Sequence, residues 1–221
     1  MINSLYSFYL SQKADEKISI RTLIIVSAIM FISSCHKDHI VPNTQASEYF
    51  PNKVGDKWVY EVYDSVKKRL DVVTVEITGK TTLPKGEAVT IWLYKYPDRI
   101  DTNYVLQSGD TIKFIPALNL NPNDYYIKKK YLSPLSVGRS WTNTFIYDTI
   151  KVLKETKLLV GSNLKFDSVY FIREKGETVN YFIYAEEYFK PGVGLVQLSK
   201  YEYDFFIPEN KVWYLKEYHL K

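Results

Sequence analysis

Alternation between two types of side chain is the feature of this sequence that most limits how the chain can fold. Apolar and polar residues recur with a period of two in residues 58–63, 72–77 and 212–219. A period of two places successive side chains on opposite faces of a β-strand, whereas a helix needs a period of 3.6. Residues after Cys35 show no long pattern of the helical kind. The sequence therefore predicts a mainly β fold.

The composition indicates what kind of sheet these strands form. The chain contains 20 Tyr and is also rich in Val, Ile and Thr, which suit a half-buried pleated surface. A long series of strands must twist and bury one face. We therefore expect a curved antiparallel sheet, a partial β-barrel or a sandwich rather than a flat sheet.

Turn signals and strand composition give further expectations. Gly and Pro predict turns at Gly79 and at residues 84–86, 97–98, 108–110, 175–176 and 208–210. Residues 181–184, Tyr-Phe-Ile-Tyr, are apolar on both sides of the expected strand. Such strands are usually covered on both faces, so we expect this one to be buried on both.

An internal echo divides the expected sheet. Residues 51–58 match residues 134–141 at Pro, Val, Gly and Trp, and a looser version occurs at residues 191–194. A Gly can adopt a positive φ in a tight loop, and the following Trp can fill the sheet interior. We interpret the echo as framework, not as a ligand site, and it predicts two related halves within a single β-rich domain at residues 49–221.

The N-terminal segment indicates where the protein is located. Residues 23–32 are apolar but too few to cross a bilayer, and Lys17 and Arg21 precede them, as in a secretory signal. The order Ile32-Ser33-Ser34-Cys35 resembles the lipobox of bacterial lipoproteins. The resemblance implies cleavage before Cys35 and a thioether-linked diacylglycerol on its sulfur. We therefore expect a signal peptide at 1–34 and a lipidated tether at 35–48; the alternative is a buried core segment with an incidental thiol.

Charge and cysteine content set limits on the mature chain. Cys35 is the only cysteine, so the expected domain has no disulfide and depends on its core. The leader holds three basic and two acidic residues, which leaves 26 basic and 23 acidic residues after it. This small, dispersed excess does not point to a nucleic acid partner. His36 and His39 lie in the tether without further ligands, so we expect no metal site.

Three longer motifs resemble a known group of proteins. They are "YFPNKVGDKWVYEV" from Tyr49, "LSPLSVGRSWTNTF" from Leu132 and "YFKPGVGLVQLSKYEY" from Tyr188. Together with the lipobox, they resemble the uncharacterised lipoproteins common in Bacteroidetes. The resemblance implies an anchored β-rich domain without an assigned reaction, in which the matching positions are framework: Phe50, Pro51, Gly55, Trp58, Tyr60, Gly138, Trp141, Gly192, Val193 and Gly194.

The same group suggests a membrane and leaves its face open. In it, a Lys-plus-acidic signal after the lipidated Cys marks export to the outer face of the outer membrane. His36-Lys37-Asp38 resembles a weak version of that signal, and an ordinary solvated tether explains the residues equally well. We therefore expect a lipid anchor in the outer membrane, with the periplasmic or surface face undecided.

The search for catalytic residues finds little. His219 is the only His after residue 48, and no Gly-x-Ser-x-Gly or phosphate-binding loop occurs. Glu186 and Glu187 are adjacent, so on a strand they point to opposite faces and cannot share a substrate. Glu61 and Glu76 are the better pair for a carboxylate-dependent glycan hydrolase. A solvated or ion-paired acid is the simpler interpretation, so we expect no catalytic residue, no enzyme activity and no cofactor.

Three functional hypotheses remain. The first is a non-enzymatic envelope lipoprotein that binds a glycan, lipid or protein through exposed aromatic side chains. The second is a carrier of lipid or another hydrophobic ligand, in which a curved sheet encloses an open apolar cavity. The third is the glycan hydrolase that uses Glu61 and Glu76.

Overall fold

The computed structural model describes residues 49–117, 120–121, 124–143, 148–204 and 207–221. Every described residue belongs to one compact unit, Asn43–Lys221. Cys35, the expected signal peptide and the expected tether, with His36 and His39, lie outside the described residues. In the part that is described, no helix has the length and apolar character needed to cross a membrane.

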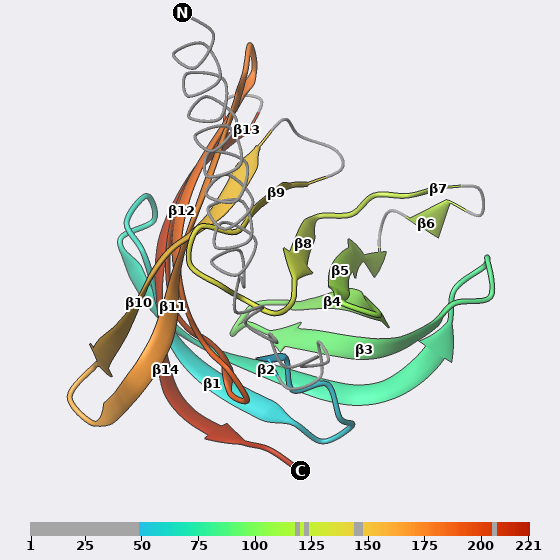
Figure 1. Cartoon of the computed structure of the whole chain (residues 1–221), viewed down its shortest axis with the longest axis horizontal. Helices are drawn as coiled ribbons and strands as arrows, with labels where there is room; N and C mark the ends of the chain where they lie inside the picture. Colours follow the sequence, from blue (N-terminus) through green and yellow to red (C-terminus); the bar gives the residue numbers. More distant parts are fainter. Residues whose placement is uncertain (1–48, 118–119, 122–123, 144–147, 205–206) are drawn as a thin grey trace, which may run out of the picture. The chain divides into compact units, whose positions relative to one another are not determined.

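The described residues form one large antiparallel sheet that curves into a nearly closed barrel (Figure 1). Its twelve strands follow one another in the order β8 (Lys129–Leu132), β5 (Thr111–Pro116), β4 (Ile100–Ser108), β3 (Ala88–Lys95), β2 (Arg69–Thr82), β1 (Lys57–Asp64), β14 (Ile207–His219), β13 (Gly194–Asp204), β12 (Tyr181–Lys190), β11 (Leu164–Thr178), β10 (Thr149–Val160) and β9 (Ser140–Thr142). A separate short pair consists of β6 (Leu120–Asn121) and β7 (Asp124–Tyr125). The predicted curved antiparallel sheet is confirmed.

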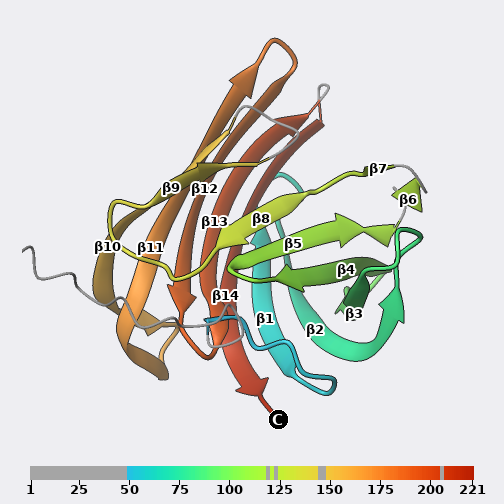
Figure 2. The ribbon, with the colours of Figure 1, turned by 45° about the vertical axis from the view of Figure 1, so that its right-hand side comes forward.

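The sheet is curved (Figure 2). The side chains on its inner face form the hydrophobic core. Aromatic rings pack against one another there: the Phe50 and Phe189 centroids are 4.3 Å apart, and Trp58 stacks on Trp92 at 5.1 Å. Alternation along the strands explains this arrangement, because every second residue is buried in β1 and, from Ile183 onward, in β12. The side chains therefore fill the interior between the facing strands.

The two edges of the sheet meet through side chains. β8 and β9 are the edge strands, and the chain runs between them through only residues 133–139. The indole N–H of Trp141 donates to the Lys130 carbonyl at 2.7 Å, and the backbone N–H of Lys130 donates to Oδ1 of Asn143 at 2.9 Å. These bonds satisfy groups that an edge strand would otherwise expose.

The internal echo corresponds to two loops with the same hydrogen bonds. The backbone N–H of Gly55 donates to the Ile77 carbonyl at 2.8 Å, and that of Gly138 donates to the Val152 carbonyl at 2.9 Å. Both glycines have a positive φ, 98° and 90°. The tryptophan three residues later is buried in each copy, so the same loop leads into the β1–β2 and β9–β10 hairpins.

Three expected turns are wrong, because the residues concerned lie inside strands. Gly79 lies within β2 at a β-bulge, a common position for a strand glycine. Gly176 lies within β11, where a Cβ atom would come within 2.6 Å of the Asp148 Cβ, so close approach rather than turning explains this glycine. Pro208 lies within β14 opposite Tyr203, next to the first residue of the strand, where its missing N–H is tolerated.

Burial of residues 181–184 on both faces is also wrong. Ile183 is buried on the inner face, whereas Tyr181, Phe182 and Tyr184 are only partly buried. Figure 2 shows that the β11–β12 hairpin projects beyond the neighbouring strands. The rings on its outer side are therefore in contact with solvent.

Candidate functional site

The outer face of the sheet, opposite the core, carries aromatic and cationic side chains on four neighbouring strands, β10 to β13. Alternation places them there, because residues two positions apart share a face and the cross-strand register aligns them. We call this group the aromatic face. Its members are Lys151, Lys154, Phe171, Arg173, Lys175, Glu177, Phe182, Tyr184, Glu186, Tyr188 and Tyr201.

Cations lie over the rings of the aromatic face. The Arg173 guanidinium is 5.5 Å from the Phe171 ring centroid and 5.7 Å from that of Tyr184. Lys175 lies 5.6 Å from the Tyr184 centroid, and Lys154 lies 5.5 Å from the Phe171 centroid. Such contacts are attractive because the ring face carries negative charge. They hold the cations and the rings side by side on the surface.

One ion pair lies within the aromatic face. Arg173 donates to Glu186 Oε1 at 2.8 Å, and the Tyr184 hydroxyl donates to the same oxygen at 2.7 Å. The hydrogen bond from Tyr184 and the charge of Arg173 lower the pKa of Glu186 below its usual value. The hydrogen bond to Glu186 in turn raises the pKa of Arg173. Both groups are therefore ionised at neutral pH.

A shallow hollow of about 390 Å³ lies at the projecting end of the aromatic face. It is lined by Lys175, Gly176, Glu177, Phe182 and Tyr184. The next strand adds the Tyr201 ring, which lies 5.7 Å from the Phe182 ring and is 42% exposed. The volume lies within the range of small-ligand sites, about 300–1,000 Å³.

The acids chosen as a hydrolase pair, Glu61 and Glu76, lie elsewhere on the outer face and are separated. Glu61 accepts from Lys216 at 2.9 Å, and Glu76 accepts from Lys95 at 2.6 Å. Glu61 lies opposite Val72, four residues from Glu76 along β2, a separation of about 13 Å. Inverting glycosidases hold their carboxyl groups about 6.5–9.5 Å apart, so this pair does not have that geometry.

Glu186 and Glu187 point to opposite faces, as their adjacency predicts. Glu187 is buried on the inner face, where it joins a second polar group that the sequence analysis missed. We call this group the inner cluster; it consists of Lys129, Tyr131, Asn143, Asp148, Glu174 and Glu187. One sequence signal could have found it, because Glu187 interrupts the apolar inward series of β12.

Every carboxylate oxygen of Glu174 and Glu187 has a partner in the inner cluster. The Lys129 ammonium donates to Glu174 Oε2 and, at 2.6 Å, to Glu187 Oε1. Asn143 donates to Glu174 Oε1 at 2.9 Å, and the Tyr131 hydroxyl donates to Glu187 Oε2 at 2.7 Å. Because these groups are buried and mutually satisfied, the inner cluster joins β8 to β11 and β12 and is poorly placed to bind a ligand.

Burial and charge shift the pKa values within the inner cluster. Burial raises the pKa of Glu174 even though Lys129 opposes the shift. Burial alone would lower the pKa of Lys129, but the charges of Glu174 and Glu187 outweigh it and raise that pKa. Burial, together with Glu187, raises the pKa of the Tyr131 hydroxyl. At neutral pH Lys129 is charged and Tyr131 is a neutral donor.

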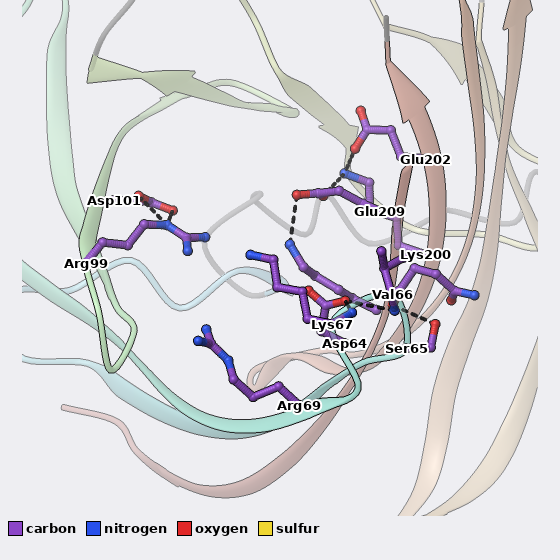
Figure 3. A network of polar contacts seen from close by, with 12 residues as sticks. Asp64, Ser65, Val66, Lys67, Arg69, Arg99, Asp101, Lys200, Glu202 and Glu209 are labelled. Atoms are coloured by element: carbon purple, nitrogen blue, oxygen red, sulfur yellow. Dashed lines mark hydrogen bonds and ion pairs between the residues drawn. The ribbon is translucent and has the colours of Figure 1, made fainter. Parts of the chain in front are cut away.

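A third polar group extends from the inner face to its rim (Figure 3). Lys200 pairs with Glu202, and Glu209 accepts from Lys211 at 2.8 Å. On the facing strands, Arg69 pairs with Asp71 and Asp98, and Arg99 pairs with Asp101. The enclosed space beside Arg69, Arg99 and Lys211 is only about 10 Å³, enough for about one water molecule. These charges largely neutralise one another, so this group is a weaker candidate than the aromatic face.

The other residues considered for catalysis or metal binding do not form a further candidate site. His219 is exposed at the end of β14. In the described ranges, no group of three or more His, Cys, Asp or Glu side chains is arranged to hold a metal ion. The aromatic face is therefore the candidate site. Sequence analysis proposed exposed aromatic side chains in general terms, but it placed residues 181–184 in the core. It did not point to the cations beside them, which lie on β10 and β11.

Two solved structures match part of the chain. One is described as a "putative lipoprotein" from Parabacteroides distasonis; it is 19% identical with a TM-score of 0.33, and the match covers 77% of this chain and 98% of that one. The other is described as a "putative exported protein with YmcC-like fold" from Bacteroides fragilis; it is 11% identical with a TM-score of 0.38, over 77% of this chain and 98% of that one. No protein-family model matches the chain, and the search of curated proteins finds no match. At these values neither structure assigns a family, a location or an activity to this chain.

Proposed function

We propose that this protein is a non-enzymatic lipoprotein of the cell envelope, anchored in the outer membrane through lipid on Cys35, whose β domain binds a glycan on the aromatic face. The observation that carries the binding proposal is the aromatic face itself. The observation behind the anchor is the order of apolar residues, small residues and a single Cys at residues 23–35.

The exposure of the rings supports binding at the aromatic face. Aromatic side chains prefer burial, yet Phe182, Tyr184 and Tyr201 lie on the surface of the projecting hairpin and its neighbouring strand. Their flat apolar faces suit the flat apolar faces of sugar rings, while the adjacent cations and the Tyr184 hydroxyl offer polar contacts. A glycan is therefore the ligand class that this surface fits best.

The inner face supports the alternative, a hydrophobic-ligand carrier, less well. A lipid placed there would have to displace the packed rings of Phe50, Trp58, Trp92 and Phe189. Displacing a well-packed core removes contacts that stabilise the fold. The hydrolase alternative is likewise weakened, because Glu61 and Glu76 are apart and each is ion-paired.

Isothermal titration calorimetry of the full chain against soluble polysaccharides tests the binding proposal. All four tryptophans are buried on the inner face, so their fluorescence reports poorly on the aromatic face. We expect Tyr184→Ala to weaken binding about tenfold, because truncating an exposed aromatic anchor removes about 1–3 kcal/mol. Tyr63→Ala, on the outer face of β1, is the matched control and should leave affinity unchanged. If no polysaccharide binds, or if both variants bind like the wild type, the aromatic face is not the site.

Metabolic labelling with palmitate tests the anchor. The wild type should incorporate label and sediment with membranes, because a lipoprotein carries enough acyl chains for stable anchoring. Cys35→Ala should incorporate none, while Cys35→Ser tests whether the thiol itself is required. A wild type that is unlabelled would overturn the anchor and favour the alternative of an incidental thiol.

A further inference from the structure

We infer that the glycan bound by the aromatic face is acidic, a polysaccharide bearing carboxylate or sulfate groups, and not a neutral one. The inference rests on the proposed function and adds the charge of the ligand to it. Three observations carry it: an excess of cations on this face, their alignment with the rings, and the position of its one ion pair.

The aromatic face carries more cations than carboxylates. Four cations, Lys151, Lys154, Arg173 and Lys175, share the aromatic face with two carboxylates, Glu177 and Glu186. Within the described residues, only Arg173 of the four cations forms an ion pair.

The outer face of β1 to β3 is balanced instead. On β1 to β3, both Glu61 and Glu76 are paired with a lysine. By comparison, β10 and β11 carry three lysines, Lys151, Lys154 and Lys175, that can pair with acidic groups of a ligand. An anionic ligand would find on the aromatic face the opposite charges that the protein itself leaves unmatched.

The cations lie alongside the rings rather than apart from them. Lys175 and Arg173 are two residues apart on β11, a step of about 7 Å, and Lys154 follows beside Phe171 on the next strand. On β12, Phe182 and Tyr184 are separated by the same step. A chain of sugars extended along these strands could place ring faces on the aromatics and acidic groups beside the cations.

The number of cations favours a sparsely charged polymer over a nucleic acid. Duplex DNA carries one negative charge about every 1.7 Å along its axis, so a protein that binds it can engage many phosphates at once. The aromatic face offers four cations, and Arg173 already contacts Glu186. A polymer with about one acidic group per sugar, or fewer, matches this density better.

Glu186 provides an internal test of the charge argument. Its Oε1 atom lies 2.8 Å from the Arg173 guanidinium, so the Glu186 carboxylate competes with an acidic ligand for this guanidinium. Replacing Glu186 with Gln keeps the side chain's size and removes the competing charge. An acidic ligand should then bind more tightly, whereas a neutral ligand should not respond.

The experiment compares carboxymethylcellulose with hydroxyethylcellulose, which share a backbone and differ in charge. The full chain is kept in mild detergent and titrated calorimetrically at low salt. We expect carboxymethylcellulose to bind at least about tenfold more tightly, the equivalent of about 1.4 kcal/mol, and to lose that advantage as salt is raised. Equal affinity for the two polymers would overturn the inference and leave the proposed function intact, whereas no binding to either would overturn both.

Three variants locate the effect. Lys154→Gln with Lys175→Gln should weaken carboxymethylcellulose binding about five- to tenfold, since two exposed charge contacts contribute up to about 1 kcal/mol each. Glu186→Gln should strengthen it about two- to fivefold. Lys95→Gln, on the balanced outer face of β1 to β3, should have no effect.

Two results with these variants would overturn the inference. Affinities for carboxymethylcellulose that do not change in the double lysine variant, or that fall in Glu186→Gln, would show that charge at this face does not select the ligand. Tighter binding to single-stranded oligothymidylate, or to vesicles containing anionic lipid, would replace the acidic glycan with that ligand.

Discussion

The two faces of β11 and β12 carry similar residues in different surroundings. On the outer face Arg173 pairs with Glu186, and on the inner face Lys129 pairs with Glu174 and Glu187. Arg173 and Glu174 are adjacent in sequence, as are Glu186 and Glu187. One step along the strand therefore separates a charge in contact with solvent from a charge enclosed by the core. The comparison shows that burial or exposure, more than the residue type, decides whether a charged side chain contributes to folding or can bind a ligand.

The energetics of the two groups differ for the same reason. A buried ion has lost its hydration, so it depends on partners in the protein, and the inner cluster supplies a partner to each carboxylate oxygen of Glu174 and Glu187. An exposed ion pair contributes little to stability because water competes with it. We therefore expect the inner cluster to govern folding, while the aromatic face remains free to govern binding.

The largest expected effect comes from removing the buried cation. Lys129→Met would leave Glu174 and Glu187 buried without their shared partner, so we expect the free energy of unfolding to fall by about 3–5 kcal/mol. Urea denaturation followed by circular dichroism measures this loss. The matched outer variant, Arg173→Met, should cost no more than about 1 kcal/mol.

One outcome would break the comparison at this point. Equal losses in the inner and outer variants would mean that burial does not separate the two groups. Should Lys129→Met prevent folding altogether, Lys129→Arg gives the graded test, because it keeps the charge and changes only the fit. A variant that retains charge should keep more stability than Lys129→Met.

A smaller effect is expected for the two tyrosine hydroxyls. Tyr131→Phe removes the donor to Glu187 in the buried interior and should cost about 1–3 kcal/mol, because a buried acceptor loses its partner. Tyr184→Phe removes the corresponding donor to Glu186 on the surface, where water replaces it, so we expect no measurable change in unfolding. Urea denaturation curves of the two variants measure their free energies of unfolding. A larger loss of stability in Tyr184→Phe than in Tyr131→Phe would contradict the assignment of Tyr131 to the inner face and Tyr184 to the outer face.

Sequence alone could predict the alternation but not the partners. A period of two predicts the strands and the opposite directions of Glu186 and Glu187. Lys129, however, lies 45 residues from Glu174 and 58 from Glu187, and it meets them only because the sheet curves until β8 faces β11 and β12. Curvature and register are properties of the whole sheet, so no local sequence pattern near Lys129 predicts the inner cluster.

For the same reason the aromatic face was not predictable, and residues 181–184 were expected to be buried. The rings at residues 181–184 are adjacent in the sequence, but Arg173 and Lys175 reach them through the pairing of β11 with β12. Gly176 is a second example of a residue whose role local sequence does not predict. It signals a turn locally, whereas its position under Asp148 requires a residue without a side chain within a strand.

The smallest expected effect is a pH dependence that has opposite signs on the two faces. The pKa of Glu174 is raised in the folded protein, so above pH 4.5 the folded state binds more protons than the unfolded state, and stability falls as pH rises through that window. The pKa of Glu186 is lowered, so below pH 4.5 the unfolded state binds more protons, and stability falls as pH falls. Because Glu186 is partly exposed, its contribution should be no more than about 1 kcal/mol.

Urea titrations of Glu174→Gln and Glu186→Gln between about pH 3.5 and 7 separate the two signs, because this range lies on both sides of the ordinary carboxyl pKa of 4.5. Relative to the wild type, Glu174→Gln should gain stability as pH rises above 4.5, because it lacks the unfavourable ionisation. Glu186→Gln should instead lose relative stability as pH rises from acid toward 4.5, because it lacks the favourable ionisation. Differences of the same sign in both variants would mean that the two carboxylates share one environment, and the contrast between the faces would fail. Opposite signs would show that burial raises the pKa of Glu174 on the inner face of β11, whereas hydrogen bonding lowers the pKa of Glu186 on the outer face of β12.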